Sequence, residues 1–163
     1  GVLPLLNAED VTREASAAVR SISWAISASF TVQVPASAPA GRYRRCPFRS
    51  IVEFGAASSR KEDADKNFAI AKDIFKNCID IRRICSSALD LCFMADGRID
   101  GYFEQNLKPW DYAAGSLILT EAGGMLSDYN GKPLPMDRPS SIIASNGVIH
   151  NQLKQIIGRY ENP

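Results

Sequence analysis

The stretch Leu107-Lys-Pro-Trp-Asp-Tyr-Ala-Ala-Gly115, continued by Thr120-Glu-Ala-Gly-Gly124, predicts a helix with one carboxylate at its first turn. Pro109 suits a first helical turn, because the N–H group that proline lacks would be unpaired there in any case. Asp111 then lies near the positive end of the helix dipole, which favours its ionised form. The Gly123-Gly124 pair ends the helix, because glycine accepts the left-handed conformation of a cap. An ionised aspartate on a rigid helix start is a suitable oxygen ligand for a hard cation such as Mg²⁺.

Short strands and helices are expected to alternate from Ile51 to the C-terminus, which predicts an α/β fold: a layered sheet with helices on its faces. The hydrophobic pattern predicts strands at 51–54, 79–84, 98–104, 125–129 and 141–144, and helices at 61–78, 86–95, from Pro109 onward and at 148–157. In the first helix, the residues at helical spacing that we expect to face the core are Phe68, Ala71, Ile74 and Phe75.

Composition limits the class of protein. A chain of 163 residues fits one domain with a core of its own, and a formal charge of +1 gives no field that would attract nucleic acid. No apolar stretch reaches a membrane-spanning length, and the N-terminus lacks a secretory signal pattern. We therefore expect a cytoplasmic protein. The cysteines are expected to be buried reduced thiols, and a zinc site is not expected because His150 is the single histidine.

Residues 1–50 differ from the rest of the chain. They hold six arginines and no lysine, two glycines, and sixteen alanine or serine residues, with few turn signals. Divergence, fusion to an unrelated segment, or translation in a shifted reading frame would each explain this difference. Because the local signals disagree with one another, we expect residues 1–50 to pack poorly against a separate α/β domain formed by residues 51–163.

Further blocks flank the Trp110-Asp111 stretch: Ile84-Cys-Ser-Ser-Ala-Leu-Asp-Leu-Cys92, Gly97-Arg-Ile-Asp-Gly-Tyr-Phe-Glu104, Gly124-Met-Leu-Ser-Asp-Tyr129 and Ile142-Ile-Ala-Ser-Asn-Gly147. In this order and spacing, the blocks resemble the C-terminal signature of the inositol monophosphatase family. The resemblance begins near Ile51 and covers about two-thirds of the chain. It implies the C-terminal half of an inositol monophosphatase-like fold.

The resemblance implies roles for two carboxylates. Asp111 would be a metal ligand near the attacking water and the phosphate; without the flanking blocks, it would be an ordinary helix-capping residue. Glu104, expected at the end of a strand, would accept a hydrogen bond from a ring hydroxyl of inositol, which suits a carboxylate. Its alternative role is that of a solvated charge.

The resemblance also implies a substrate-binding turn at Cys85, Ser86 and Ser87. The family usually has glycine at the first of these positions and a small apolar residue at the third, so this chain departs from the family pattern twice. Helix-start N–H groups bind anionic phosphate esters, although helix capping alone would explain Ser86. Ser58, in the Ser58-Ser59-Arg60 segment, would also reach toward the substrate, or would belong to a polar surface turn.

The function implied is Mg²⁺-dependent hydrolysis of an inositol monophosphate or a related sugar-alcohol phosphate. The family's first metal-binding motif has no counterpart here, so we expect a C-terminal fragment that has no useful activity alone. The alternatives are a bisphosphate nucleotidase, a fructose-1,6-bisphosphatase, or a non-catalytic binding domain. The expected partner is a small phosphate monoester rather than nucleic acid or membrane, and a homodimer of the full-length protein is compatible with the sequence. Asp111, Glu104 and the Cys85–Ser87 turn are expected to converge on one cleft.

Overall fold

The computed structural model describes residues 49–57 and 60–161. Its elements follow in the order β1 (Ile51–Phe54), the short 3-10 helix η2 (Lys61–Asp63), α2 (Ala64–Phe75), β2 (Asp80–Arg82), α3 (Ser87–Ala95), β3 (Gly101–Leu107), α4 (Pro109–Glu121), β4 (Met125–Ser127), β5 (Ser140–Ser145) and α5 (His150–Gly158). Residues 1–48, and with them Cys46, lie outside the described part, as does Ser58. The expected poor packing of residues 1–50 therefore stays a prediction.

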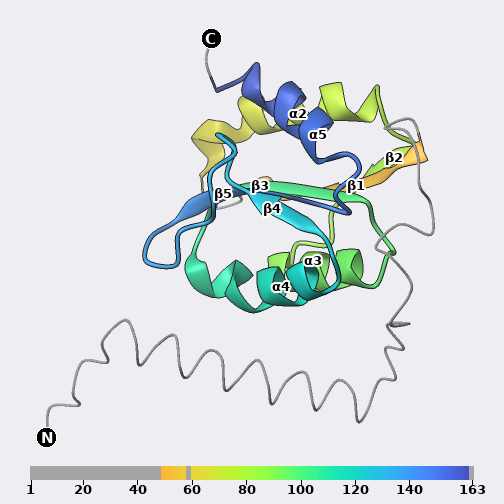
Figure 1. The fold of residues 1–163 in the computed structure, drawn as a ribbon. Coiled ribbons are helices and arrows are strands. Elements are labelled where there is room, and N and C mark those ends of the chain that lie inside the picture. The colour runs from red at the N-terminus through yellow and green to blue at the C-terminus, as the bar shows by residue number, and fades with distance from the viewer. Residues whose placement is uncertain (1–48, 58–59, 162–163) are drawn as a thin grey trace, which may run out of the picture. The chain divides into compact units, whose positions relative to one another are not determined.

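Within the described ranges, five strands form one mixed sheet in the order β2-β1-β3-β5-β4. β1 pairs in parallel with both β2 and β3, whereas β5 runs antiparallel to β3 and to β4. Helices α2 and α5 cover one face of the sheet, and α3 and α4 cover the other (Figure 1). The prediction of a layered α/β fold is confirmed.

The parallel strands β1, β2 and β3 share one direction, so their carboxyl ends lie at the same edge of the sheet. After β2 the chain turns through Cys85 into α3, and after β3 it passes directly into α4. Both helices lie on the same face, and both start at this edge (Figure 1). Ligands of open α/β sheets bind outside the carboxyl ends of the strands, so the topology brings the start of α3 and the start of α4 to such an edge.

Alternation of side chains along the strands divides the core into two clusters. Val52 and Phe103 pack with α2 and α5 on one face of the sheet. Tyr102, next to Phe103 on β3, packs on the other face with Leu91 of α3 and Leu119 of α4. Side chains at even positions of β3 therefore point toward α3 and α4, which determines where Glu104 lies.

Helix α2 presents a different face to the core than the sequence predicts. It is shorter than the expected 61–78, and Phe68 and Phe75 are 52% and 51% exposed, so their assignment to the core is wrong. The buried set has the spacing i, i+3, i+4 and i+7 of a narrow helical stripe, and consists of Asn67, Ile70, Ala71 and Ile74. Phe68 lies at the rim, where its ring contacts the Phe54 ring edge-on at 5.7 Å between centroids.

The end of α4 agrees with the sequence. Gly123 has a φ of +83°, and its N–H group donates to the Thr120 carbonyl at 2.9 Å. The N–H group of Gly124 donates to the Leu119 carbonyl at 2.9 Å, which completes a Schellman motif. The predicted glycine cap is confirmed.

The contact between α3 and α4 leads to a prediction about Gly115. A Cβ atom at this position would lie 2.7 Å from Leu91 Cβ and Cδ1, closer than side chains pack. Overpacking a core costs about 1–3 kcal/mol, which exceeds the ~1 kcal/mol that alanine gains over glycine in a helix. We expect Gly115→Ala to lower the midpoint of urea unfolding.

Gly158→Ala is the matched control for this substitution. A Cβ atom there, at the last residue of α5, meets no atom within 4 Å. The control should therefore unfold at the same urea concentration as the unaltered chain or at a higher one. The close-packing argument fails if Gly115→Ala is as stable as Gly158→Ala.

Candidate functional site

The turn between β2 and α3 places Cys85 in a strained conformation, at a position where the family that this chain resembles usually has glycine. Cys85 is exposed and has a φ of +67°, a left-handed conformation that costs a residue with a side chain roughly 1–2 kcal/mol. Ser86 occupies the N-cap position with an extended backbone, but its side chain makes no capping hydrogen bond. The N-cap position expected for Ser86 is confirmed, but the side chain does not stabilise the helix start by a capping hydrogen bond.

Glu104 lies within strand β3 rather than at its end, because the strand runs from Gly101 to Leu107 and not over 98–104. The pairing of β3 with β5 shifts register between Glu104 and Leu107, and Asn106 there has a φ of +58°. Such an irregularity bends a strand and redirects its side chains. The irregularity lies between Glu104 and the start of α4.

Three chain segments meet at the Glu104 carboxylate. Ser87, the first residue of α3, donates from Oγ to Glu104 Oε2 at 3.1 Å, and the Tyr102 hydroxyl donates to the same oxygen. Gly55, which follows β1, lies directly beneath the carboxylate, since a Cβ atom there would be 1.8 Å from Glu104 Cδ. Ser87 and Glu104, predicted as neighbours, are thus in contact. Tyr102 and Gly55 were not predicted at the site. Tyr102 could have been predicted there, because a residue two positions before Glu104 on a strand lies on the same face of the sheet.

A second pair of carboxyl groups is buried on the same face of the sheet. Glu53 of β1 is 2% exposed and Asp90 of α3 is 3% exposed, and the two carboxyl groups interact with each other. Burial, followed by the hydrogen bond and the charge of Glu53, raises the pKa of Asp90 to about 8. Burial also raises the pKa of Glu53. The pair therefore holds a proton at neutral pH, beside the negative charge of Glu104.

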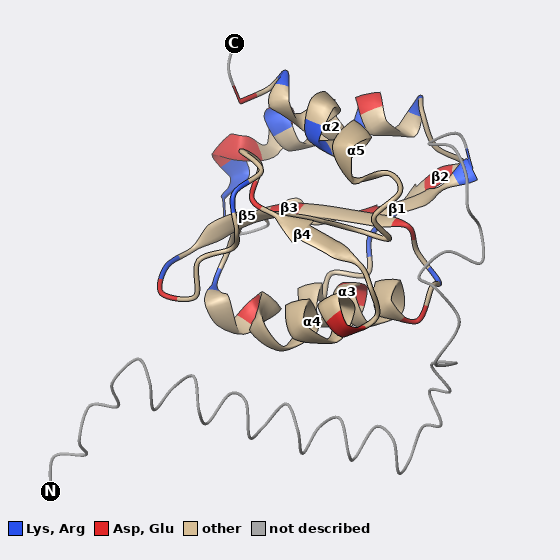
Figure 2. Cartoon of the chain, viewed as in Figure 1, with Lys and Arg blue, Asp and Glu red and all other residues tan. Residues whose placement is uncertain are grey.

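Little positive charge surrounds these acidic groups. Neither α3 nor α4 contains lysine or arginine, and Figure 2 shows acidic side chains on both helices but no basic ones. Within residues 49–57 and 60–161, no lysine or arginine forms an ion pair with Glu53, Asp90 or Glu104. Arg60, in the segment after Ser58, pairs instead with Glu62 and Asp63.

Asp111 occupies the first turn of α4, as predicted. Its Oδ2 accepts a hydrogen bond from the Lys108 backbone N–H at 2.9 Å, so it stabilises the helix start. This contact uses one of the two carboxylate oxygens, and the side chain is half-buried. The capping role and a ligand role are therefore compatible, and the ligand role stays a prediction.

Asp111 has the right chemistry for one Mg²⁺ ligand, but the ion needs several oxygen atoms. In the part of the chain that the structure describes, no three histidine, cysteine, aspartate or glutamate side chains are grouped as a metal site. The described residues therefore fit a contribution to a magnesium site, through Asp111, and not a complete one.

The cysteines differ from the expectation. Cys78, Cys85 and Cys92 are free thiols, but Cys85 is exposed and the other two are half-buried, so the prediction that they are all buried is wrong. Burial raises the pKa of the Cys78 and Cys92 thiols. A thiol with a raised pKa is a poor nucleophile, which argues against a catalytic role for these two residues.

A buried serine-histidine chain links β4, β5 and α5. His150 Nε2 lies 3.0 Å from Ser127 Oγ, and His150 Nδ1 lies 3.1 Å from Ser145 Oγ. Ser127 donates its own proton to the Asp128 carbonyl, so it accepts from the imidazole rather than donating to it. Burial lowers the pKa of His150. Neutral His150 then accepts from Ser145 at Nδ1. The arrangement is structural, because Ser127, Ser145 and His150 are all buried, with 5%, 0% and 4% exposed, and no substrate reaches them.

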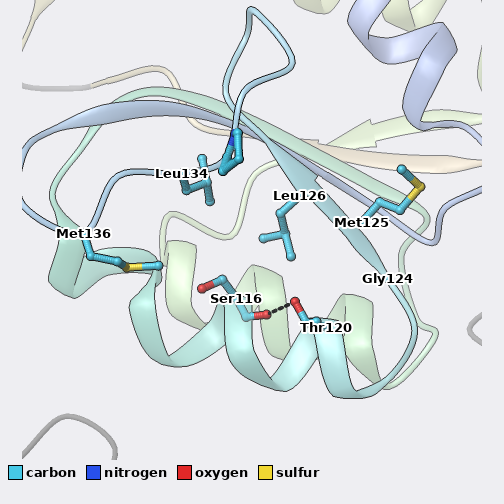
Figure 3. A pocket seen from close by; sticks show the side chains of 8 residues that line it. Ser116, Thr120, Gly124, Met125, Leu126, Leu134 and Met136 are labelled. Atoms are coloured by element: carbon cyan, nitrogen blue, oxygen red, sulfur yellow. Dashed lines mark hydrogen bonds between the residues drawn. The ribbon is translucent and has the colours of Figure 1, made fainter. Parts of the chain in front are cut away.

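A cavity of about 430 Å³ lies beside α4 and β4 (Figure 3), away from the candidate residues. Its polar lining groups are already engaged within the helix, because Ser116 donates to the Ala113 carbonyl and Thr120 donates to the Ser116 carbonyl. None of its lining residues is a predicted site residue; they are Ser116, Thr120, Gly124, Met125, Leu126, Pro133, Leu134 and Met136. The single cleft expected for Asp111, Glu104 and the Cys85–Ser87 turn stays a prediction.

No helix in the described ranges is long and apolar enough to cross a membrane.

The sequence matches known proteins over most of its length. The model of the inositol monophosphatase family matches residues 40–161. A protein named Nus factor SuhB from Pasteurella multocida is 55% identical over 64 residues, which make up 39% of this chain and 24% of that protein. A protein of the same name from Haemophilus influenzae is 39% identical over 107 residues, or 66% of this chain and 40% of its own.

Solved structures share the fold. Inositol monophosphatase from Anabaena (Nostoc) sp. PCC 7120 is 37% identical with a TM-score of 0.64, and the match covers 69% of this chain and 44% of that chain. SaIMPase-II with inositol monophosphate bound is 26% identical with a TM-score of 0.64, and the match covers 72% of this chain and 46% of that chain. The chain thus spans less than half the length of the relatives it matches.

The buried pair makes stability depend on pH. Folded Asp90 keeps its proton to about pH 8, whereas the ordinary pKa is 3.8. Between these values the folded state binds more protons than the unfolded state, so the free energy of unfolding falls as pH rises from about 4 to 8. Asparagine needs no proton to donate to Glu53, so Asp90→Asn should raise the free energy of unfolding at pH 8 by roughly 1–3 kcal/mol.

Urea unfolding at pH 5, 6.5 and 8 checks this prediction. The difference between Asp90→Asn and the unaltered chain should grow with pH. Asp137→Asn, at a side chain that is 73% exposed, is the control and should leave the pH profile unchanged. A pH profile of Asp90→Asn that runs parallel to that of the control would show that the pair holds no extra proton.

Proposed function

Since the chain belongs to the inositol monophosphatase family, we propose that the protein hydrolyses phosphate monoesters of inositol or of a related sugar alcohol, with Mg²⁺ as cofactor. The observation that supports this most is the Glu104 carboxylate of β3, which Ser87 at the start of α3 binds, in the strand that leads into α4 and Asp111. A fixed carboxylate beside a helix start suits a substrate with both hydroxyl groups and a phosphate. The solved SaIMPase-II relative binds inositol monophosphate.

In this proposal each candidate residue has its own task. Asp111 provides one oxygen ligand to Mg²⁺, which would activate water and stabilise the leaving alkoxide when bound. Glu104 accepts a hydrogen bond from a substrate hydroxyl and thereby orients the ring. The start of α3, at Cys85, Ser86 and Ser87, binds the anionic ester through backbone N–H groups. The Ser86 hydroxyl adds a donor, whereas that of Ser87 donates to Glu104. Ser58 is proposed to contact the substrate from the segment after β1.

The proposal concerns the complete protein, because the chain spans less than half of its relatives. Asp111 alone would hold Mg²⁺ weakly, since the ion retains most of its water unless several oxygen atoms bind it. We therefore propose that this chain, by itself, has no useful phosphatase activity and supplies the substrate-orienting half of the site. A bisphosphate nucleotidase or a fructose-1,6-bisphosphatase remains the alternative within the same superfamily.

A second candidate function is non-catalytic binding on the same scaffold. Two observations favour it: several relatives bear the name Nus factor SuhB, and the described residues contain no complete metal cluster. Phosphate release separates the two candidates, because a binding domain would release none in any context.

The activity test uses the 163-residue chain and the same chain joined to the portion of the Anabaena inositol monophosphatase that it does not match. With Mg²⁺ and inositol monophosphate, the chain alone should release no more phosphate than its Asp111→Asn variant. The joined protein should release phosphate, and Asp111→Asn in it should reduce the rate about 100-fold or more, since the metal supplies both nucleophile and charge stabilisation. Full activity of that variant would leave Asp111 as a helix cap only.

Glu104→Gln in the joined protein tests substrate orientation. A hydrogen bond to a charged group contributes about 1.5–3 kcal/mol, so kcat/KM for inositol monophosphate should fall roughly 10-fold or more. Methyl phosphate has no alcohol hydroxyl that could donate a hydrogen bond to Glu104, so the kcat/KM for this ester should change little. Glu121→Gln, at an exposed residue at the end of α4, is the control for loss of a carboxylate. An equal loss with both esters would contradict the orienting role.

A further inference from the structure

The two oxygens of the Glu104 carboxylate have different surroundings. Oε2 accepts hydrogen bonds from Ser87 Oγ, at 3.1 Å, and from the Tyr102 hydroxyl. Among the residues that the structure describes, no donor is hydrogen-bonded to Oε1. A carboxylate can accept about four hydrogen bonds, so two neutral donors fill Oε2 and leave Oε1 as the oxygen available to a ligand.

Both donors are held by rigid parts of the fold. Tyr102 is completely buried in strand β3, and its burial, followed by the charge of Glu104, raises the pKa of its phenol. The phenol therefore keeps its proton and donates it to Glu104. Ser87 is fixed as the first residue of α3. Ser87 belongs to α3 and Tyr102 to β3, so the Glu104 carboxylate cannot rotate without breaking its hydrogen bonds to both residues.

The surface beneath the carboxylate restricts it further. Gly55 leaves room for the carboxylate, because a Cβ atom there would lie 2.1 Å from Oε2 and 2.2 Å from Oε1. The Gly55 N–H group donates to the Phe103 carbonyl at 2.9 Å, which keeps β1 at a fixed distance from β3. Glu104 is thus packed against backbone on one side and held by hydroxyls on another.

We propose that Ser87 and Tyr102 are positioning residues that bind Oε2 of Glu104 and leave Oε1 to accept a single substrate hydroxyl. This rests on the proposed function and makes it more specific. A carboxylate that uses both oxygens recognises two neighbouring hydroxyls, whereas one that is tethered at Oε2 recognises one. The site then selects phosphate monoesters by one hydroxyl at a fixed distance from the phosphate, and a second neighbouring hydroxyl adds little affinity.

The first arm of the test examines, without any ligand, the hydrogen bond from Ser87 to Glu104, which we call the tether. Urea unfolding of the full chain is measured for Ser87→Ala, Glu104→Ala and the double variant, since non-additive effects report direct interaction and neither alanine keeps the contact. The double variant should lose less stability than the sum of the two single variants. Ser116→Ala, which removes a hydroxyl that donates to the Ala113 carbonyl and not to Glu104, should combine additively with Glu104→Ala. Additive effects for Ser87 and Glu104 would overturn the tether, whatever the protein does.

The second arm examines recognition. Inositol monophosphate and methyl phosphate are titrated into the full chain with Mg²⁺, and the backbone NMR signals of Gly55 and Ser87 report binding. Ser87→Ala should raise the Kd for inositol monophosphate about 3–10-fold, the effect of one hydrogen bond, and leave that for methyl phosphate unchanged. Ser87→Thr keeps the hydroxyl and should restore the affinity, which a merely structural role would not require.

The outcomes separate the two proposals. An equal loss of affinity for both esters, or no rescue by Ser87→Thr, would overturn the positioning role. If the unaltered chain binds neither ester, the recognition role fails in this chain, whereas the tether is still decided by the unfolding measurements. The proposed function, which concerns the complete protein, is decided separately by phosphate release from the joined protein. A second hydroxyl that adds tenfold affinity, measured with a pair of polyol phosphates that differ in that hydroxyl alone, would overturn recognition through Oε1 alone.

Discussion

The hydrogen bond from the Gly55 N–H group to the Phe103 carbonyl is the contact on which the candidate site depends. It extends the parallel pairing of β1 and β3 by one residue and places Glu104 directly over a residue that has no side chain. A shift of register by one residue would turn Glu104 toward α2 and α5, because side chains alternate between the faces of a strand. The strand pairing thus decides both the face and the height at which the carboxylate meets Ser87.

Acidic side chains are concentrated on the face of the sheet that α3 and α4 cover. They are stabilised by bound protons and by hydroxyl donors rather than by cations. Asp90 shares a proton with Glu53, and Glu104 is bound by two neutral donors. Isolated buried charges are expensive, so a carboxyl group that finds no cation binds a proton instead. A cation such as Mg²⁺, bound by Asp111 at the same edge, would enter a region without competing lysine or arginine from α3 or α4. This electrostatic setting supports the phosphatase proposal.

The helix cap of α4 and the proposed metal ligand are the same residue, Asp111. A carboxylate at the first turn of a helix stabilises that helix by accepting a backbone hydrogen bond, and this contact leaves its second oxygen for the proposed metal ion. The cap fixes the orientation of the side chain, which reduces the conformational freedom that a ligand would lose on binding. A capping contact is therefore no argument against a metal-binding role.

The sequence by itself determined the features that depend on neighbours along the chain. Pro109, Asp111 and the Gly123-Gly124 cap define α4, and alternation of short elements defines the α/β class. The tertiary structure decided which helical face is buried, since α2 turns Ile70 rather than Phe68 toward the sheet. It also decided that Ser87 meets Glu104, seventeen residues away, and that Glu53 meets Asp90. These pairs arise from the strand order and register, which are long-range properties that no local pattern encodes.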